Sequence, residues 1–493
     1  RYGDRNEISL QEAQMRTFNN FIWRFAQTEG NYNFSSGSRG KGNLSSEANP
    51  YFLFPQIYNF RYNIFSSEWP VANRVIELYL QKKSENGGWE RQINGISNNE
   101  KAVLLLEKRT FKELLVDMEL RNLQNNIVGQ EASRLFARAE INMGVEAFRD
   151  SLYSLLKRNT FLNIKFENML DTLGEISRTD IRSLLGEWEK TTSLPFYSLG
   201  EPTLTKITNK GGEEFFVLKM LISNNSDYDG IIHMDIRKDG WWYQPLEDPR
   251  AKTKIEMPAH TSKEFVSVWE DQIRNVEINT MVSGNLPNII SQDINNVKQE
   301  RNKIVKDSIY ILPESSFDLP GEIIVDNEDS TLFILSAPPI VGLLPKWLDE
   351  VEETPFKYSG ISWWRPPLQW TATTNDRYYG KYIRSAFVIK SGDGSQTATW
   401  KVPVPEVGQY DLYYHVFKDD ELRWNNNLQG EYHFKVKYGS EVEDAYVNLR
   451  KANEGWEQLG SYYFDSDTIR VVLTDECKLR SVTADAVKIV KRY

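Results

Sequence analysis

The chain has 493 residues, of which 40% are hydrophobic and 13% aromatic, and it carries a formal net charge of −10. This length and composition predict two to four folded domains and exclude a disordered chain. The acidic balance argues against a nucleic-acid-binding protein, whose electrostatic footprint would be basic. The single cysteine, Cys477, excludes an intrachain disulfide and a cysteine-based zinc site.

Residues 1–198 are predicted to form a helical domain, because apolar side chains recur there at helical spacing. The expected helices cover residues 12–25, 70–82, 99–124, 129–142, 144–158, 164–173 and 178–191. The third of these begins with a capping cluster of Ser97, Asn98 and Asn99, with Glu100 in the first turn. The Gly/Ser-rich segment 35–43 is interpreted as a surface loop, because its Gly-Lys pair lacks the Ser or Thr that completes a phosphate-binding loop.

Residues 199–335 predict an antiparallel β-sandwich, because short strand-like runs alternate there with turn clusters. The expected strands cover residues 204–207, 214–222, 231–236, 253–257, 263–269, 275–283, 308–312 and 321–325. A segment rich in proline and tryptophan, residues 336–370, is interpreted as a linker.

Residues 371–493 predict a second β module, in which the strand from Gln409 onward alternates with period two. The expected strands cover residues 386–390, 397–402, 409–417, 431–438, 443–447, 457–464, 468–473 and 484–491. The predicted fold class is therefore multidomain α+β, with a helical domain, then an antiparallel β-sandwich, then a C-terminal jelly-roll-like β-sandwich.

Two motifs stand near the C-terminus: residues 455–464, Gly-Trp-Glu-Gln-Leu-Gly-Ser-Tyr-Tyr-Phe, and residues 484–487, Ala-Asp-Ala-Val. With the strands around them they resemble the golvesin C-terminal-like domain, a carbohydrate-binding-type module at the ends of bacterial xanthan lyases and cell-envelope proteins. This resemblance implies a surface-binding module. It also implies a protein of the bacterial cell envelope, in the periplasm or at the cell surface, or a secreted one.

The helical part carries a different resemblance, through residues 135–148, 166–171, 178–188 and 194–197. Their succession is similar to the helical half that follows the zinc site in gluzincin (thermolysin-like) zinc aminopeptidases. That family holds Zn²⁺ with two histidines four residues apart on one helix. The histidines of this chain have no such spacing; they are His233, His260, His415 and His433.

The sequence therefore predicts a peptidase-like region without a zinc motif, a pseudoenzyme, and no metal or other cofactor. Purified protein is expected to contain no stoichiometric zinc, which elemental analysis would test. No Gly-x-Ser-x-Gly motif is present, and the acidic neighbours of Cys477 disfavour its thiolate. Glu100 and Glu107 could share a helix face as a glycosidase pair, but solvated charges are the favoured interpretation. No catalytic residue is predicted, and the sequence favours a protein without enzymatic activity but does not exclude an enzyme.

Aromatic side chains are the better functional signal, because rings stack on the C–H faces of sugars. Trp400 and Trp456 are interpreted as core or structural residues, and residues 241–243, Trp-Trp-Tyr, as a domain interface or a ligand platform. Trp424→Ala is expected to weaken glycan binding without changing the melting temperature. The predicted ligand-binding residues are Trp424, Arg423, Asn425, Asn426, Asp420, Trp364 and Tyr379.

The function predicted from these features is that of a non-catalytic bacterial cell-envelope or secreted protein. Its β modules would bind a polysaccharide or a partner protein of the envelope, and no nucleic acid. The alternative is the C-terminal portion of a larger zinc aminopeptidase-like protein, whose catalytic or membrane-spanning segment would lie upstream of Arg1. The longest apolar run, residues 331–344, is short and interrupted by two prolines, so no transmembrane segment is predicted in this chain.

Overall fold

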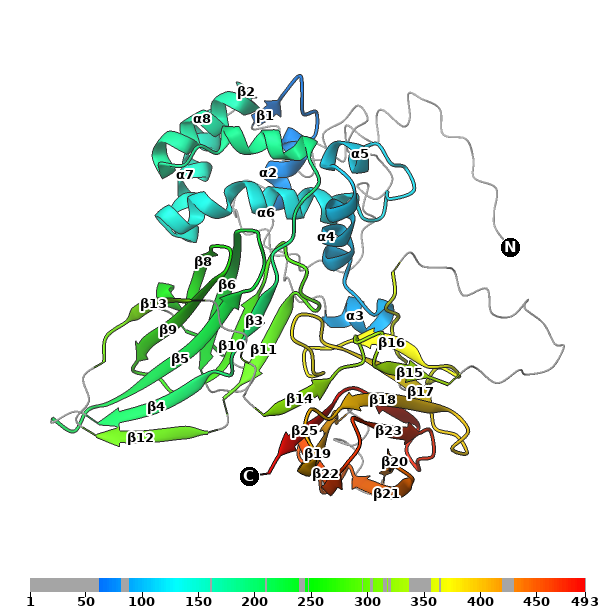
Figure 1. Ribbon diagram of the computed structural model, residues 1–493. Coiled ribbons are helices and arrows are strands. Elements are labelled where there is room, and N and C mark those ends of the chain that lie inside the picture. Colours follow the sequence, from blue (N-terminus) through cyan, green and yellow to red (C-terminus); the bar gives the residue numbers. More distant parts are fainter. Residues whose placement is uncertain are drawn as a thin grey trace, which may run out of the picture. The chain divides into compact units, whose positions relative to one another are not determined.

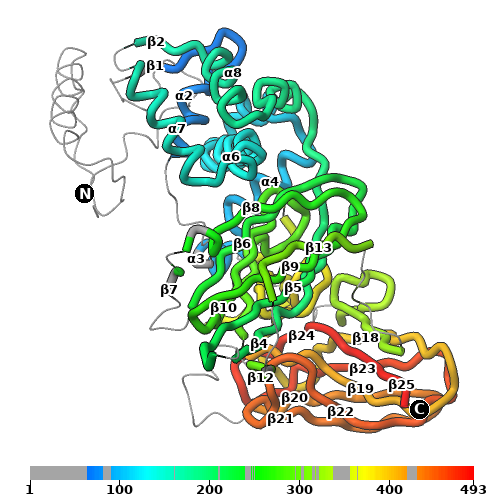
Figure 2. Tube along the Cα trace, turned by 90° about the vertical axis from the view of Figure 1, so that its left-hand side faces the viewer, coloured from blue at the N-terminus to red at the C-terminus, as the bar shows by residue number. Residues whose placement is uncertain are grey.

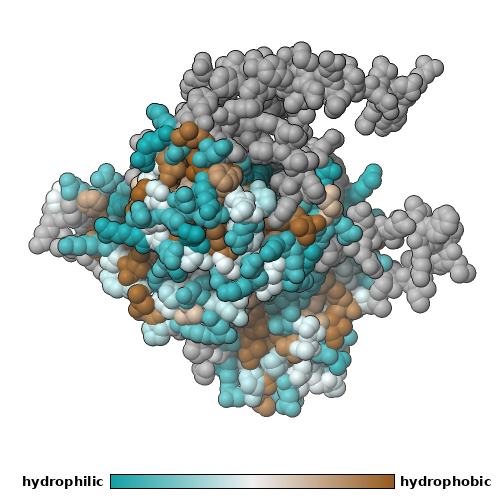
Figure 3. Space-filling model, turned by 90° about the horizontal axis from the view of Figure 1, so that it is seen from above, coloured by the Kyte–Doolittle hydropathy of each residue, from teal (hydrophilic) through white to brown (hydrophobic). Residues whose placement is uncertain are grey.

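The computed structural model (Figure 1) describes the following residues: 62–80, 88–159, 162–208, 211–238, 244–246, 248–294, 296–301, 305–313, 317, 321–336, 356–362, 365–418 and 430–492. The chain divides into two compact units, one comprising residues 1–85 and 112–188 and the other residues 86–111 and 189–493. On the face shown in Figure 3, hydrophobic side chains lie in separate groups between hydrophilic ones.

The first unit is helical. Its elements are β1 (Tyr62–Phe65), α2 (Ala72–Leu80), α5 (Phe111–Leu115), α6 (Gln124–Met143), α7 (Val145–Arg158), β2 (Leu162–Lys165), α8 (Phe166–Ser177) and the 3₁₀ helix η1 (Arg182–Glu189). Tyr79, Phe136 and Phe148 form an aromatic core, with ring centroids 4.7–6.0 Å apart. The Tyr79 hydroxyl donates to Oε1 of buried Glu140 at 2.7 Å. The aromatic core therefore supplies a hydrogen-bond donor to the buried carboxylate of Glu140.

The predicted helices differ from the observed ones at two places. The expected helix 99–124 is broken at Arg109, whose extended backbone ends α4 (Asn98–Lys108) before α5 begins. The expected α-helix 178–191 is η1, a 3₁₀ helix. The helix expected at 12–25, the loop 35–43 and the aromatic run 241–243 lie outside the described residues.

The second unit contains α3 (Gly88–Asn94), α4 and two β-sandwiches. The first sandwich packs one sheet, in the order β12-β4-β5-β9-β13 with β3 beside β5, against another in the order β11-β10-β6-β7 with β8 beside β6. Strands of the first sheet are β3 (Tyr197–Leu199), β4 (Thr203–Thr208), β5 (Glu214–Asn224), β9 (Thr261–Trp269), β12 (Val297–Arg301) and β13 (Ser308–Pro313). Strands of the second are β6 (Gly230–Lys238), β7 (Gln244–Pro245), β8 (Lys252–Met257), β10 (Ile273–Asn279) and β11 (Ile289–Asp293), and η2 (Pro249–Ala251) precedes β8.

Glu100 is a structural residue of this unit. It closes the capping box of α4 by accepting from the Ser97 backbone at 2.6 Å. Its side chain also accepts from the Asn288 backbone and pairs with Arg91, both at 2.8 Å, and the residue is 1% exposed. The interpretation of Glu100 as a solvated charge is therefore wrong, because a periodic helix pattern does not show which face a later sandwich covers.

The second sandwich, here termed the terminal module, gathers the strands from β14 onward (Figures 1 and 2). One sheet has the order β14-β25-β19-β22, with β14 (Glu322–Val325), β25 (Val487–Lys491), β19 (Gly408–Val416) and β22 (Gly455–Phe464). The facing sheet has the order β15-β18-β23-β20-β21, with β15 (Phe333–Leu335), β18 (Thr397–Pro403), β23 (Thr468–Thr474), β20 (Glu431–Tyr438) and β21 (Glu441–Asn448). A third sheet joins β16 (Thr371–Thr374), β17 (Ser385–Lys390) and β24 (Ser481–Ala484).

Two boundaries of the terminal module differ from the prediction. The strand expected at 321–325 in the first sandwich is β14, which pairs with β25, and β15 likewise pairs with β18. The strand expected at 484–491 is divided by Asp485 and Ala486 into β24 and β25, which belong to different sheets. Asp485 thus lies where the chain passes from one sheet to the other.

The core between the two main sheets is aromatic and buried. It includes Trp400, Tyr410, Tyr414, Phe434 and Phe464, each no more than 1% exposed. These residues alternate along their strands with outward-facing ones, as the pleat requires. The prediction of Trp400 as a core residue is confirmed. Within the described part of the chain, no helix has the length and apolarity needed to cross a membrane.

Candidate functional site

The outward position of Trp456 depends on an irregularity in β22. Leu412 of β19 pairs with Gly460, whereas the next residue, Tyr413, pairs with Gln458, so Leu459 is an extra residue on β22. An extra residue reverses the alternation of side chains beyond it. Tyr462 therefore faces the core, whereas Trp456, an even number of residues away, pairs with His415 on the outer face.

Three rings meet on this face. The Trp456 ring lies 5.2 Å from the imidazole of His415 and 5.0 Å from the ring of Tyr379, measured between centroids. The third pair, Tyr379 and His415, is 5.7 Å apart. The rings are inclined by 59–76° to one another, and all three residues are partly exposed. We term these residues the ring cluster.

Asp485 fixes two members of the ring cluster from below. Its Oδ2 lies 2.8 Å from Nδ1 of His415, and the carboxylate is 0% exposed. The backbone N–H of Tyr379 donates to both carboxylate oxygens at 3.2 Å. Burial raises the pKa of Asp485, while His415, Tyr379 and Arg384 act against this shift. The carboxylate thus orients both the imidazole and the segment that carries Tyr379.

The segment carrying Tyr379 has a second anchor. The Arg384 N–H donates to Leu286 O at 2.6 Å and the Leu286 N–H donates to Tyr382 O at 3.1 Å. Asn285 also donates to Tyr382 O, at 3.3 Å. Hydrogen bonds at both ends hold Tyr379 in place.

Charged groups border the ring cluster and are paired. Lys488 Nζ lies 4.9 Å from the Trp456 ring centroid and 5.3 Å from that of Tyr413, and it donates to Glu322 at 3.0 Å. Farther along the face, Arg492 donates to Asp411 at 2.8 Å and lowers the pKa of that carboxyl. This face therefore offers aromatic surface surrounded by hydrogen-bonding groups.

The structure tests only part of the predicted ligand set. Tyr379 belongs to the ring cluster, whereas Trp424, Arg423, Asn425, Asn426, Asp420 and Trp364 lie outside the described residues, so their roles stay predictions. Sequence reasoning missed His415, Asp485 and Lys488, and it interpreted Trp456 as a core or structural residue, whereas Trp456 is partly exposed on the outer face. The signals available were a polar residue between the buried positions of β19 and an aspartate inside an apolar strand-like run.

The geometry supports recognition more directly than catalysis. Among the described residues, no Ser, Thr or Cys side chain hydrogen-bonds to His415, so the His415–Asp485 pair activates no nucleophile seen there. The same residues contain no group of three or more His, Cys, Asp or Glu side chains placed to hold a metal ion. Exposed rings over a rigid support can stack on the apolar face of a sugar.

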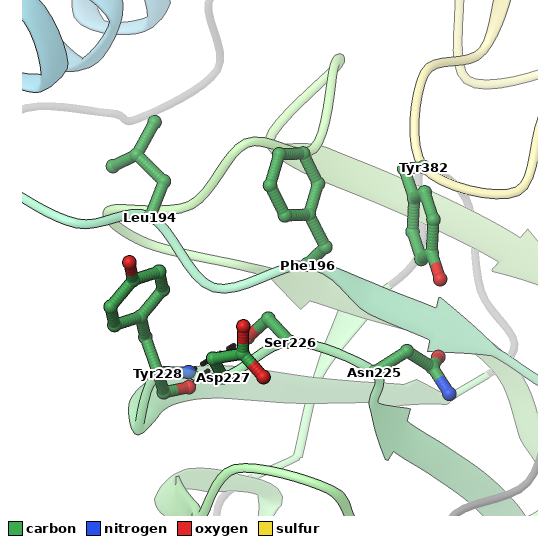
Figure 4. A pocket seen from close by; sticks show the side chains of 7 residues that line it. All are labelled: Leu194, Phe196, Asn225, Ser226, Asp227, Tyr228 and Tyr382. Atoms are coloured by element: carbon green, nitrogen blue, oxygen red, sulfur yellow. Dashed lines mark hydrogen bonds between the residues drawn. The ribbon is translucent and has the colours of Figure 1, made fainter.

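A separate pocket lies in the first sandwich, beside the segment that carries Tyr379. It has a volume of about 250 Å³ and is lined by Leu194, Phe196, Asn225, Ser226, Asp227, Tyr228 and Tyr382 (Figure 4). Three polar side chains of its lining have partners: Ser226 donates to Asn224, Asn225 accepts from Ser198, and Asp227 pairs with His260. The ring cluster is the stronger candidate, because its rings are anchored and partly exposed.

Comparison with known proteins identifies the terminal module. Residues 366–491 match the family model of the Golvesin C-terminal domain, which confirms the resemblance drawn from the Trp456 and Asp485 motifs. The ring cluster lies entirely within this domain. A search of curated proteins found no match for the chain. The resemblance of the helical part to gluzincin aminopeptidases stays a prediction.

Solved structures give only distant likenesses. A Bacteroides uniformis beta-glucuronidase has a TM-score of 0.18 and 9% identity over 64% of this chain and 32% of its own. B. uniformis beta-glucuronidase 2, covalently bound to cyclophellitol-6-carboxylate aziridine, has a TM-score of 0.18 and 11% identity over 71% of this chain and 38% of its own. A Sulfolobus turreted icosahedral virus protein has a TM-score of 0.13 and 9% identity, over 62% of this chain and 97% of its own. The chain spans about a third of the glucuronidases' length, and scores this low carry no argument.

The family match therefore identifies residues 366–491 of the terminal module. Golvesin C-terminal domains occur in secreted or cell-surface proteins.

Proposed function

We propose that this chain belongs to a non-catalytic bacterial protein, secreted or held in the cell envelope, that binds a polysaccharide on the outer face of its β14-β25-β19-β22 sheet. The observation that carries the proposal is the ring cluster, Tyr379, His415 and Trp456, supported from below by buried Asp485. The Golvesin C-terminal domain match supports the same class of ligand.

The chemistry of the face suits a sugar. Trp456 and Tyr379 present rings inclined by 59°, so one pyranose face can stack on either ring while its hydroxyls reach the border. Lys488 is a donor beside Trp456, and Asp411 is an acceptor farther along the face. Aromatic stacking combined with a few placed polar groups is the general design of small-ligand recognition.

The rigidity of the ring cluster favours binding. Binding usually costs about 0.5–1.5 kcal/mol for each flexible side chain that becomes ordered. His415 is held by Asp485, and Trp456 packs against both other rings, so much of this ordering is complete before a ligand arrives.

The test uses the whole chain on a glycan array, followed by fluorescence titration of each glycan that binds. Trp456→Ala is expected to weaken binding at least about fivefold, because stacking on one ring contributes about 1–3 kcal/mol by analogy with base stacking. Tyr310→Ala is the matched control, since Tyr310 is an aromatic residue of the first sandwich and is 51% exposed. Absence of saturable glycan binding, or equal effects of the two substitutions, would reject the proposal and favour a protein partner.

A further inference from the structure

The opposite outer face of the terminal module has a different character. In the β15-β18-β23-β20-β21 sheet, Trp400, Val471 and Val436 face the core. Because side chains alternate along a strand, Lys401, Arg470 and Lys437 point outward from the same three strands. The outer face of this sheet therefore carries cations from three neighbouring strands.

These cations stand in one row. Lys401 of β18 is the direct cross-strand partner of Arg470 of β23, and Arg470 is the direct partner of Lys437 of β20. Lys435, two residues before Lys437, adds a fourth cation one row away. Like charges directly opposite one another destabilise a sheet. We term Lys401, Arg470, Lys437 and Lys435 the cation row.

The four side chains of the cation row form no ion pair in the described part of the chain, and Asp444, the direct cross-strand partner of Lys435, is engaged elsewhere. Two carboxylates, those of Asp444 and Glu476, lie 2.7 and 3.3 Å from the two ring nitrogens of His433 instead. In a chain with a net charge of −10, this concentration of unpaired positive charge attracts an anionic ligand.

We propose that the cation row binds an anionic polysaccharide, a chain that carries a carboxylate or sulfate on its sugar units. Neighbouring strands are about 4.8 Å apart, which is close to the length of one sugar unit in an extended chain. A polysaccharide crossing β18, β23 and β20 would therefore place successive anionic groups over Lys401, Arg470 and Lys437. Arg470, at the centre, can bind a carboxylate or sulfate through two nitrogens.

Other polyanions fit the row less well. An acidic peptide usually adds to a sheet along its edge strand, whereas the cation row runs across the strands. A single-stranded nucleic acid requires aromatic side chains interleaved with the cations. The exposed ring of Tyr446 on this face stacks on His433 instead, and Val442 is the residue that continues the row. The proposal does not depend on the ring cluster, because the two faces share no outward side chain.

The test measures binding of the whole chain to polygalacturonate, with dextran as the neutral polysaccharide and dextran sulfate as the sulfated one. Polygalacturonate is expected to bind, with an affinity that falls as salt rises. Arg470→Glu is expected to weaken this binding at least about tenfold, since it removes charge-assisted hydrogen bonds and adds a repulsive negative charge. If Arg470→Glu weakens the binding of dextran sulfate more than that of polygalacturonate, the ligand of the cation row carries sulfate rather than carboxylate.

Two controls make the result specific. Lys451→Glu reverses an exposed charge elsewhere in the module and is expected to leave binding unchanged. Trp456→Ala is expected to leave polygalacturonate binding intact, which separates failure of this proposal from failure of the proposed function. Equal binding of poly-L-glutamate or single-stranded DNA, or an unaltered affinity of Arg470→Glu, would overturn the inference.

Discussion

The two outer faces of the terminal module share one core but differ in whether their charged side chains form ion pairs. On the ring-cluster face the charged groups are paired: His415 with Asp485, Lys488 with Glu322, and Arg492 with Asp411. On the facing sheet the cation row has no ionic partner among the described residues. A β-sandwich permits this difference, because the inward residues fix the fold and leave the outward ones free to vary.

The largest effect is expected from a substitution in the core that supports both outer faces. Trp400→Ala would leave a cavity between the sheets and deprive Asp485 O of the indole N–H that donates to it at 3.2 Å. Such a substitution costs about 3–5 kcal/mol of unfolding free energy. Urea denaturation should show this loss, together with loss of both glycan and polyanion binding. The control is Thr399→Ala on the outer side of β18, which is expected to change the unfolding free energy by no more than about 0.5 kcal/mol. If the two substitutions lower the unfolding free energy equally, Trp400 does not contribute to the core as described.

The next effect concerns the ring-cluster face alone and depends on pH. Because the folded-state pKa of Asp485 lies above its ordinary value of 3.8, the folded protein holds this proton more tightly than the unfolded chain. The contribution of Asp485 to stability is therefore fully present below pH 3.8 and is lost as pH rises through the raised pKa. Within that window the unfolding free energy falls by at most about 1.4 kcal/mol for each pH step of one.

Asp485→Asn removes this titration, so the variant should gain stability relative to the wild type as pH rises over that window. Urea denaturation at several pH values from the ordinary pKa upward measures the difference. A difference that stays constant with pH would mean that Asp485 titrates alike in the folded and unfolded states. Polygalacturonate binding should be the same for both proteins at neutral pH.

The smallest expected effect is on the unfolding free energy, which repulsion within the cation row lowers. Arg470→Glu would place a negative charge between Lys401 and Lys437 and so replace two repulsive cross-strand pairs with attractive ones. The unfolding free energy should rise by about 0.2–1 kcal/mol at low salt, and less at high salt. Calorimetric melting at two salt concentrations measures this rise. A fall in melting temperature would show that the row is already neutralised within the free protein.

Much of the fold could be predicted from the sequence. The alternation in residues 409–417 predicted β19, and the buried set that includes Tyr410 and Tyr414 follows from it. The motifs around Trp456 and Asp485 sufficed to indicate the Golvesin C-terminal domain. Local signals such as these succeed because period and turn chemistry depend on neighbours in the chain.

The sequence by itself determined which residues could form strands and how rich the chain is in aromatic residues. It also determined that no histidine pair has the spacing of a helical zinc motif. Only the tertiary structure decided that Leu459 reverses the alternation of β22, that Asp485 lies at a change of sheet beneath His415, and that Lys401, Arg470 and Lys437 align. The physical reason is that register and sheet order pair residues far apart in sequence, and a single extra residue moves a side chain to the opposite face.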